Sequence, residues 1–179
     1  MNARAPDAAA VPDVRGDVLR RADAIAGIAS ADDRMKAFVE LWWGSARCES
    51  GEAMSWAGFY LDQPGEPDAA RLVLGHRLPK PACSPIGVHG ACGQSLLAGR
   101  SLVVIDVADL GAGYVACDPR DRSELVVPCL RPDGSAWAVF DVDSHSVGAF
   151  SRGDAELCER CLQAAGLSAA HRHAPTMSR

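Results

Sequence analysis

The chain has 179 residues, of which 48% are hydrophobic and 23% charged, as expected for one globular domain with its own core. Its formal net charge of -5 argues against nucleic acid or an anionic membrane as a partner, because both select for basic surfaces. No apolar run approaches the roughly 20 residues of a membrane-spanning helix, and the amino terminus lacks the apolar core of a signal peptide. We therefore expect a cytoplasmic protein with a disordered leader at 1–12, one domain at 13–170 and a flexible tail at 171–179.

Helical patterns stand at both ends of the domain. The first covers about residues 13–48, where apolar residues recur at helical spacing after the capping pair Ser30 and Asp33. The second begins at another capping pair, Ser151 and Asp154, and places apolar residues and two cysteines on one face.

The segments between these helices are strands and turns. We expect strands at 54–61, 71–77, 101–106, 124–130 and 136–143, and a short helix at 93–99. Three prolines exclude a regular element from the segment before that short helix. Terminal helices around hairpin-connected strands predict an α+β domain, with helices packed on a mainly antiparallel sheet.

Seven cysteines are many for such a chain, and in a reducing compartment they suggest redox chemistry or metal binding rather than structural disulfides. Cys158 and Cys161 form a C-x-x-C pair, but the pair lies inside a helix and beside leucines, so we interpret it as part of an apolar stripe. Cys129 within a strand and Cys48 at a helix end are also expected to be structural.

Three further cysteines, Cys83, Cys92 and Cys117, fall in loops or at the start of elements. Cys117 precedes Asp118 and Pro119, which are typical of the start of a short helix. The positive end of a helix favours the reactive thiolate. Arginines and aspartates in the same segment act in opposite directions, so the sequence leaves the net effect on the thiol open.

Three carboxylates are predicted to share one face of a hairpin. Strand periodicity places Asp141 and Asp143 on the same side. A two-residue turn at Asp133–Gly134 would place Glu124 opposite Asp143, whereas a three-residue loop would place Glu124 opposite Val142. Such a cluster is either a solvated polar face or a site for an amine ligand, a metal or a shared proton.

Four motifs in this order resemble the free methionine-(R)-sulfoxide reductases, which are stand-alone GAF-domain enzymes: "WAGFY" at 56–60, "KPAC…GACG" at 80–93, "ACD…SELVVP" at 116–128 and "FDVDS" at 140–144. The resemblance extends over about residues 54–167 and includes all three loop cysteines. It implies a GAF-like fold and reduction of free rather than protein-bound methionine sulfoxide.

The resemblance also implies roles for residues. Cys117 would be the catalytic thiol, Cys83 the main resolving thiol, and Cys92 a further thiol able to form a disulfide. The substrate-binding residues would be Trp56, Tyr60, Asp106, Glu124, Asp141 and Asp143. No metal or cofactor is implied, thioredoxin would be the reductant, and a homodimer is consistent with the family.

Two other interpretations stay open at this point. A non-enzymatic GAF sensor for a small molecule or redox state would share the fold without needing three loop thiols. A zinc site built from Cys83, His89, Cys92 and Cys117 is a third possibility, although the spacing of these residues is not typical of zinc sites.

Overall fold

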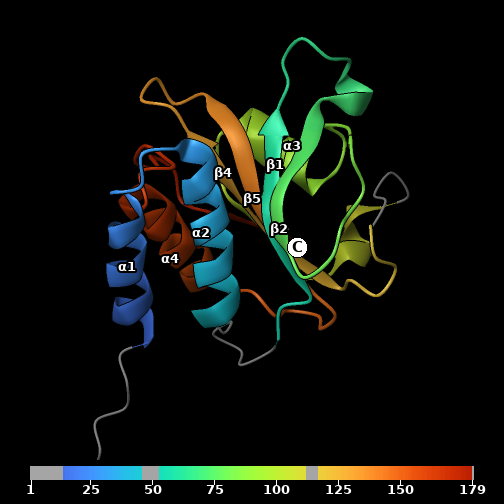
Figure 1. Ribbon diagram of the computed structural model, residues 1–179. Helices are drawn as coiled ribbons and strands as arrows, with labels where there is room; N and C mark the ends of the chain where they lie inside the picture. The colour runs from blue at the N-terminus through green and yellow to red at the C-terminus, as the bar shows by residue number, and fades with distance from the viewer. Residues whose placement is uncertain (1–13, 46–52, 112–116, 179) are drawn as a thin grey trace, which may run out of the picture.

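The computed structural model describes residues 14–45, 53–111 and 117–178 (Figure 1). The expected leader at 1–12 and Cys48 lie outside these ranges. The described elements form a layered α+β domain, which confirms the fold class expected from the sequence.

Three helices lie on one side of a central sheet (Figure 1): α2 (Ala31–Ser45) and α4 (Arg152–Ala164) contact its strands, and α1 (Val14–Ile25) packs against these two helices. The short helix α3 (Ala91–Ala98) contacts β3, β4 and β5 from the opposite face. The capping box at α4 is present as expected, and the Ser30 hydroxyl accepts a 3.3 Å bond from the backbone N–H of Asp33 at the start of α2. Within the described ranges, no helix has the length and apolar character that crossing a bilayer requires.

The sheet has six strands in the order β2-β1-β5-β4-β3-β6. Their bounds are β1 Trp56–Asp62, β2 Leu72–Leu78, β3 Leu102–Val104, β4 Ser123–Leu130, β5 Ala136–Ser144 and β6 Thr176–Met177. All neighbouring pairs are antiparallel except β3 and β6. Two 3-10 turns, Asp68–Ala70 and Val107–Leu110, lie in the connections.

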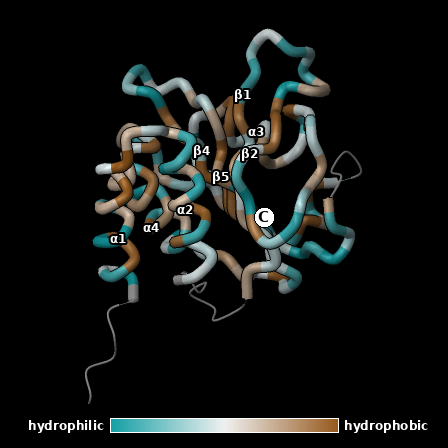
Figure 2. Tube along the Cα trace, in the orientation of Figure 1, coloured by the Kyte–Doolittle hydropathy of each residue, from teal (hydrophilic) through white to brown (hydrophobic). Residues whose placement is uncertain are grey.

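The main core lies between the sheet and these helices, and Figure 2 shows hydrophobic central strands beside α2. Phe140 packs edge-on against Phe38 of α2, at 5.0 Å between ring centroids, and in a tilted arrangement against Phe59 at 4.9 Å. Three cysteines are fully buried in the same core: Cys129, Cys158 and Cys161. This placement confirms that the C-x-x-C pair belongs to an apolar stripe.

Alternation along the central strands puts different chemistry on the other face of the sheet. On β1, Phe59 points to the helices, so Trp56 and Tyr60 lie on the opposite side. On β5, Phe140 points to the helices and Asp141 lies on the opposite side. This second face carries the candidate site.

The register of the β4–β5 hairpin places Glu124 directly opposite Asp143, and Val126 opposite Asp141. The expected pairing of the two carboxylates is therefore confirmed. Across β1, Asp143 also faces Trp56, so one rung of the sheet holds an indole and two carboxylates.

The turn that produces this register differs from the expected two-residue turn. The backbone N–H of Arg131 donates to the carbonyl of Ser135 at 2.8 Å, which closes a three-residue loop with Gly134 at φ 92°. A bulge near Trp137 then adds one residue to β5 and restores the pairing that a two-residue turn would give.

The C-terminal segment differs from the expected flexible tail. Thr176 and Met177 form β6, which pairs in parallel with β3. The Ser178 hydroxyl accepts a 2.9 Å bond from the backbone N–H of Ile105. These contacts bind residues 176–178 to the edge of the sheet.

Candidate functional site

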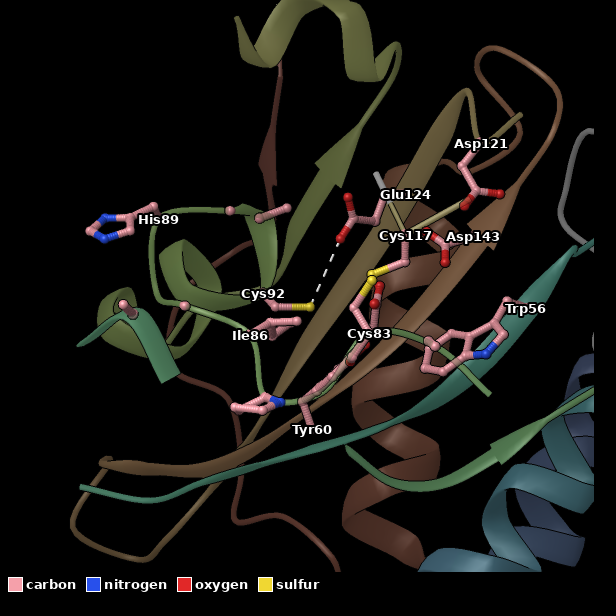
Figure 3. A pocket seen from close by; sticks show the side chains of 17 residues that line it. Trp56, Tyr60, Cys83, Ile86, His89, Cys92, Cys117, Asp121, Glu124 and Asp143 are labelled. Carbon is pink, nitrogen blue, oxygen red and sulfur yellow. Dashed lines mark hydrogen bonds between the residues drawn. The ribbon is translucent and has the colours of Figure 1, made fainter. Parts of the chain in front are cut away.

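A cavity of about 310 Å³ lies on the second face of the sheet, between the central strands, the start of α3 and the loop after β2 (Figure 3). Eight of the nine residues predicted for the site line it: Trp56, Tyr60, Cys83, Cys92, Cys117, Glu124, Asp141 and Asp143. Segments far apart in the sequence therefore meet here, and the cavity is large enough to hold a small molecule.

The wall on β1 is aromatic. The rings of Trp56 and Tyr60 are 6.0 Å apart, and the indole lies over Gly58 between them. A Cβ at Gly58 would lie 2.5 Å from Cη2 of Trp56, so any side chain there would displace the indole. The glycine thus allows the indole to lie along the strand.

The same aromatic residues hold the segment that carries Cys83. Nε1 of Trp56 donates to the carbonyl of Lys80 at 2.9 Å, and the Tyr60 hydroxyl donates to the carbonyl of Cys83 at 2.9 Å. Ile86 pairs with the first residue of β2 through backbone hydrogen bonds of 2.8 and 2.9 Å. These bonds place the exposed Cys83 at the cavity in a segment that is neither helix nor strand.

Cys117 is followed by a turn, so the expected short helix is absent from the described residues after it. The backbone N–H of Asp121 donates to the carbonyl of Asp118 at 3.1 Å, and the Asp118 carboxylate accepts from the N–H of Arg120 at 3.1 Å. Arg122 already bonds to the carbonyl of Ser144 at 2.8 Å, at the start of the sheet pairing. Because the chain enters β4 at once, no helix can form.

The Cys117 thiol lies beside Cys83 and the Tyr60 hydroxyl, and Figure 3 shows the two sulfur atoms next to one another. Burial of the thiol raises the pKa of Cys117 to about 12, and its hydrogen bond with the Cys83 side chain adds to the rise. Without a helix dipole to oppose burial, the thiol keeps its proton at neutral pH. A reaction at this sulfur therefore has a proton to transfer.

Cys92 lies among the carboxylates. It is buried in the first turn of α3, and its Sγ is 3.9 Å from Oε1 of Glu124 (Figure 3). Burial and the nearby charges of Asp141 and Glu124 raise the pKa of this thiol well above its usual range. The groups that contact the Cys117 thiol are different, namely Cys83 and Tyr60.

The carboxylates are crowded and shielded from water. Glu124 and Asp141 are only 4% and 5% exposed, and Asp143 is partly buried. Burial, then repulsion from neighbouring carboxylates, raises the pKa of Asp141 and of Asp143 well above the usual range. Oδ1 of Asp141 is buried without a hydrogen-bond partner among the described residues. The cluster is thus suited to hold a proton or to receive a cationic ligand.

Asp121 also lines the cavity, and sequence reasoning missed this role. Its carboxylate accepts a 3.0 Å bond from the Ser55 hydroxyl and lies 3.6 Å from Nε2 of His145. Burial raises its pKa. The strand periodicity that located the other carboxylates does not extend into the turn, so the sequence carried no signal for the direction of this side chain.

Asp106 is the predicted site residue that does not line the cavity. Its carboxylate caps the 3-10 turn Val107–Leu110 by accepting from the N–H of Ala108 at 3.1 Å. It also pairs with Arg122 at 3.0 Å. These two donors lower the pKa of Asp106 and bind its carboxylate away from the cavity, so its expected role in substrate binding stays a prediction.

The residues of the alternative zinc site, Cys83, His89, Cys92 and Cys117, line the cavity without gathering into a ligand cluster. Within the described ranges, two groups of potential ligand atoms lie within 4.8 Å of one another: Cys92, Glu124 and Asp141, and Asp118, Asp121 and His145. Neither group contains the Cys83–Cys117 pair.

No protein-family model matches the chain. The chain is similar to a free methionine-R-sulfoxide reductase of Saccharomyces cerevisiae, with 35% identity over 108 residues, which are 60% of this chain and 58% of the yeast protein. The match thus spans less than two thirds of that relative.

Two solved structures extend the comparison. The free methionine-R-sulfoxide reductase from Neisseria meningitidis in complex with its substrate has a TM-score of 0.70 and 27% identity, covering 93% of this chain and 98% of that one. A structure of a GAF domain has a TM-score of 0.74 and 26% identity, covering 87% of this chain and 88% of that one. The expected GAF-like fold is confirmed.

Proposed function

We propose that the chain is a free methionine-(R)-sulfoxide reductase of the GAF-domain type, which reduces free methionine-(R)-sulfoxide to methionine. The observation that carries this proposal is the contact between Cys117 and Cys83 at a cavity lined by an aromatic wall and buried carboxylates. A sulfur nucleophile, a second thiol and a proton store are the groups that a sulfoxide reduction needs.

The cavity supports a free amino acid as the substrate. The crowded carboxylates Glu124, Asp141 and Asp143 match the ammonium group of an amino acid, which would relieve their mutual repulsion. The indole of Trp56 offers an apolar surface to the methyl end of the substrate. A methionine sulfoxide within a polypeptide has no ammonium group to place among the carboxylates.

In the first step, Sγ of Cys117 attacks the sulfoxide sulfur. The oxygen passes to Cys117, the sulfoxide is reduced to methionine, and the thiol becomes a sulfenic acid. The proton that leaves the thiol balances charge that develops on the oxygen. A protonated carboxyl group such as Asp141 can assist by donating a hydrogen bond to that oxygen.

In the second step, Cys83 attacks the sulfenic acid of Cys117, a disulfide forms and water leaves. The contact between the two side chains supports Cys83 in this role. A dithiol reductant of the thioredoxin class, in a reducing compartment such as the cytoplasm, then reduces this disulfide by thiol–disulfide exchange. Both thiols are restored, and the reductant is oxidised to its own disulfide.

The proposal is tested by incubating the protein with racemic methionine sulfoxide, thioredoxin, thioredoxin reductase and NADPH. We expect NADPH consumption that stops when half of the racemate, the R epimer, has been used. Cys117→Ser should abolish consumption, whereas Cys129→Ser, which changes a buried core thiol, is the matched control. Binding of methionine sulfoxide without any NADPH consumption would instead support the sensor function.

A further inference from the structure

An ion pair links the two segments that carry the reacting thiols. We define the Cys83 loop as residues 79–85 and the Cys117 turn as residues 117–121. The ammonium group of Lys80 in the loop donates to Oδ2 of Asp118 in the turn. In the part of the chain that the structure describes, no other ion pair joins these two segments.

We propose that Lys80 is a positioning residue for disulfide formation, because its ion pair with Asp118 holds Cys83 within reach of Cys117. This inference rests on the proposed function, since it concerns the second step of that reaction. It predicts that Lys80 affects the conversion of the sulfenic acid to the disulfide and not the reduction of the sulfoxide.

Lys80 is fixed at both ends and stays outside the main cavity. Its carbonyl accepts from Nε1 of Trp56 at 2.9 Å, which ties the backbone to β1, and its side chain crosses to Asp118. Lys80 does not line the 310 Å³ cavity, but it lines an adjoining hollow of about 80 Å³ together with Trp56 and Cys117. Replacing Lys80 by methionine keeps most of the length of the side chain. The change therefore removes the ion pair to Asp118 and leaves the backbone bond to Trp56 and the lining of the larger cavity in place.

Charge compensation of Asp118 does not account for the position of Lys80, because Arg120 already pairs with the same carboxylate. Asp118 also accepts from Nε and Nη2 of Arg120 at 3.0 and 2.7 Å, within its own turn. Its side chain is only 10% exposed, and Arg120 and Lys80 lower its pKa, so it is a charged acceptor at neutral pH. What Lys80 adds to this arrangement is the connection to the other segment.

The link matters because both thiols depend on their own segments for position. Cys83 and Cys117 are exposed as whole residues, although the Cys117 thiol itself faces the cavity, and neither belongs to the two buried hydrophobic clusters. The rate of the second step rises with the fraction of time that the two sulfur atoms are in contact, as for any intramolecular reaction. Of the two thiols, only Cys117 takes part in the first step, so that step does not depend on the position of Cys83.

The experiment is a single turnover without reductant, in which methionine release, the sulfenic acid and the disulfide are each measured. Dimedone traps the sulfenic acid, and mass spectrometry follows the disulfide. For Lys80→Met we expect methionine release within twofold of the unaltered protein and disulfide formation slower by about threefold to tenfold, as for a partly shielded ion pair. Dimedone-trapped Cys117 should accumulate accordingly.

Two further variants make the test specific. Lys80→Arg keeps the charge and should restore most of the rate. Arg120→Met removes a cation from the same carboxylate within the turn and should leave disulfide formation near the normal rate. The proposal is overturned if Lys80→Met forms the disulfide at the normal rate, if Arg120→Met slows it equally, or if Lys80→Met slows methionine release to the same extent.

Hydrogen peroxide separates this proposal from the proposed function. Peroxide oxidises the Cys117 thiol to the sulfenic acid with release of water, without any sulfoxide. If the unaltered protein releases no methionine from the sulfoxide, the proposed function fails. The effect of Lys80→Met on the subsequent disulfide formation can still be measured, and it supports or overturns the positioning role on its own.

Discussion

The side chains of Glu124 and Asp143 occupy directly opposed positions on β4 and β5, and Asp143 is in turn opposed to Trp56 on β1. Like charges in opposed positions destabilise a sheet. Here the pair is also shielded from water, which raises the pKa of Asp143. The opposed carboxylates thus lower the free energy of unfolding of the ligand-free protein, and they provide a place for a cation or a proton.

Asp141→Asn should stabilise the protein at neutral pH. A carboxyl group whose pKa is raised in the folded state is stabilising below its unfolded pKa of about 3.9, and this contribution is lost as pH rises through the folded pKa. Each unit of the rise corresponds to about 1.4 kcal/mol. We expect the free energy of unfolding in urea at pH 8 to increase by at least about 1 kcal/mol, with a weaker pH dependence between pH 4 and 8.

Asp133→Asn provides the control for this measurement, because Asp133 is exposed at the hairpin tip and its pKa is lowered by bonds from Ser135. It should show no stabilisation at pH 8. An Asp141→Asn protein that is less stable than the unaltered one at pH 8 would contradict the prediction.

Reductase activity of Asp141→Asn should fall by about tenfold or more, since a proton donor and a charge are both lost.

Gly58→Ala should weaken substrate binding. The added methyl group would lie 2.5 Å from Cη2 of Trp56 and 2.6 Å from Cβ of Arg77, so the indole must move out of its place along β1. We expect KM to increase by about tenfold, measured with free methionine sulfoxide. Gly75→Ala on β2 is the matched control, because its nearest contacts would be 3.4 Å or more. Equal effects of the two variants would exclude this explanation.

Alkylation of Cys117 should depend steeply on pH. Because its pKa is raised to about 12, the thiolate fraction grows nearly tenfold per pH unit from pH 7 to pH 10. In the unaltered, fully reduced protein, labelling of Cys117 by iodoacetamide, followed by peptide mass spectrometry that separates it from Cys83, should increase in the same proportion. A rate that levels off below pH 9 would show that the thiol is not held in its protonated form.

Asp121→Asn and Asp106→Asn should show which of these two carboxylates takes part in substrate binding. Asp121 lines the cavity, whereas Asp106 caps a 3-10 turn and pairs with Arg122. We expect Asp121→Asn to lower kcat/KM by about fivefold or more, because a buried charge beside the substrate is removed. Asp106→Asn should leave kcat/KM unchanged, since asparagine also caps turns. The reverse order of effects would support Asp106, and not Asp121, as a substrate-binding residue.

The sequence predicted the features that depend on local periodicity. Alternation along the strand placed Asp141 and Asp143 on one face, and the pairing with Glu124 is confirmed although the loop and a bulge near Trp137 produce it jointly. Capping residues located the start of α4 at Ser151. These elements follow from interactions between residues close together in the chain.

The remaining features depend on contacts between distant segments. Asp118 and Pro119 carry the residue types of a helix start, but the backbone bond from Arg122 to Ser144 draws the chain into the sheet instead. The link from Lys80 to Asp118 spans 38 positions of sequence. No local pattern specifies such a contact, because it depends on how two irregular segments lie against the same strands.

The pairing of Ile86 with β2 also affects the outer edge of the sheet. An edge strand with free N–H and C=O groups invites pairing with another chain. At β2, Ile86 occupies the backbone groups of Leu72 through two hydrogen bonds, and at the opposite edge β6 covers β3. The segment that presents Cys83 therefore also shortens the open edge of β2, so changes that release this segment would favour self-association as well as a loss of catalysis.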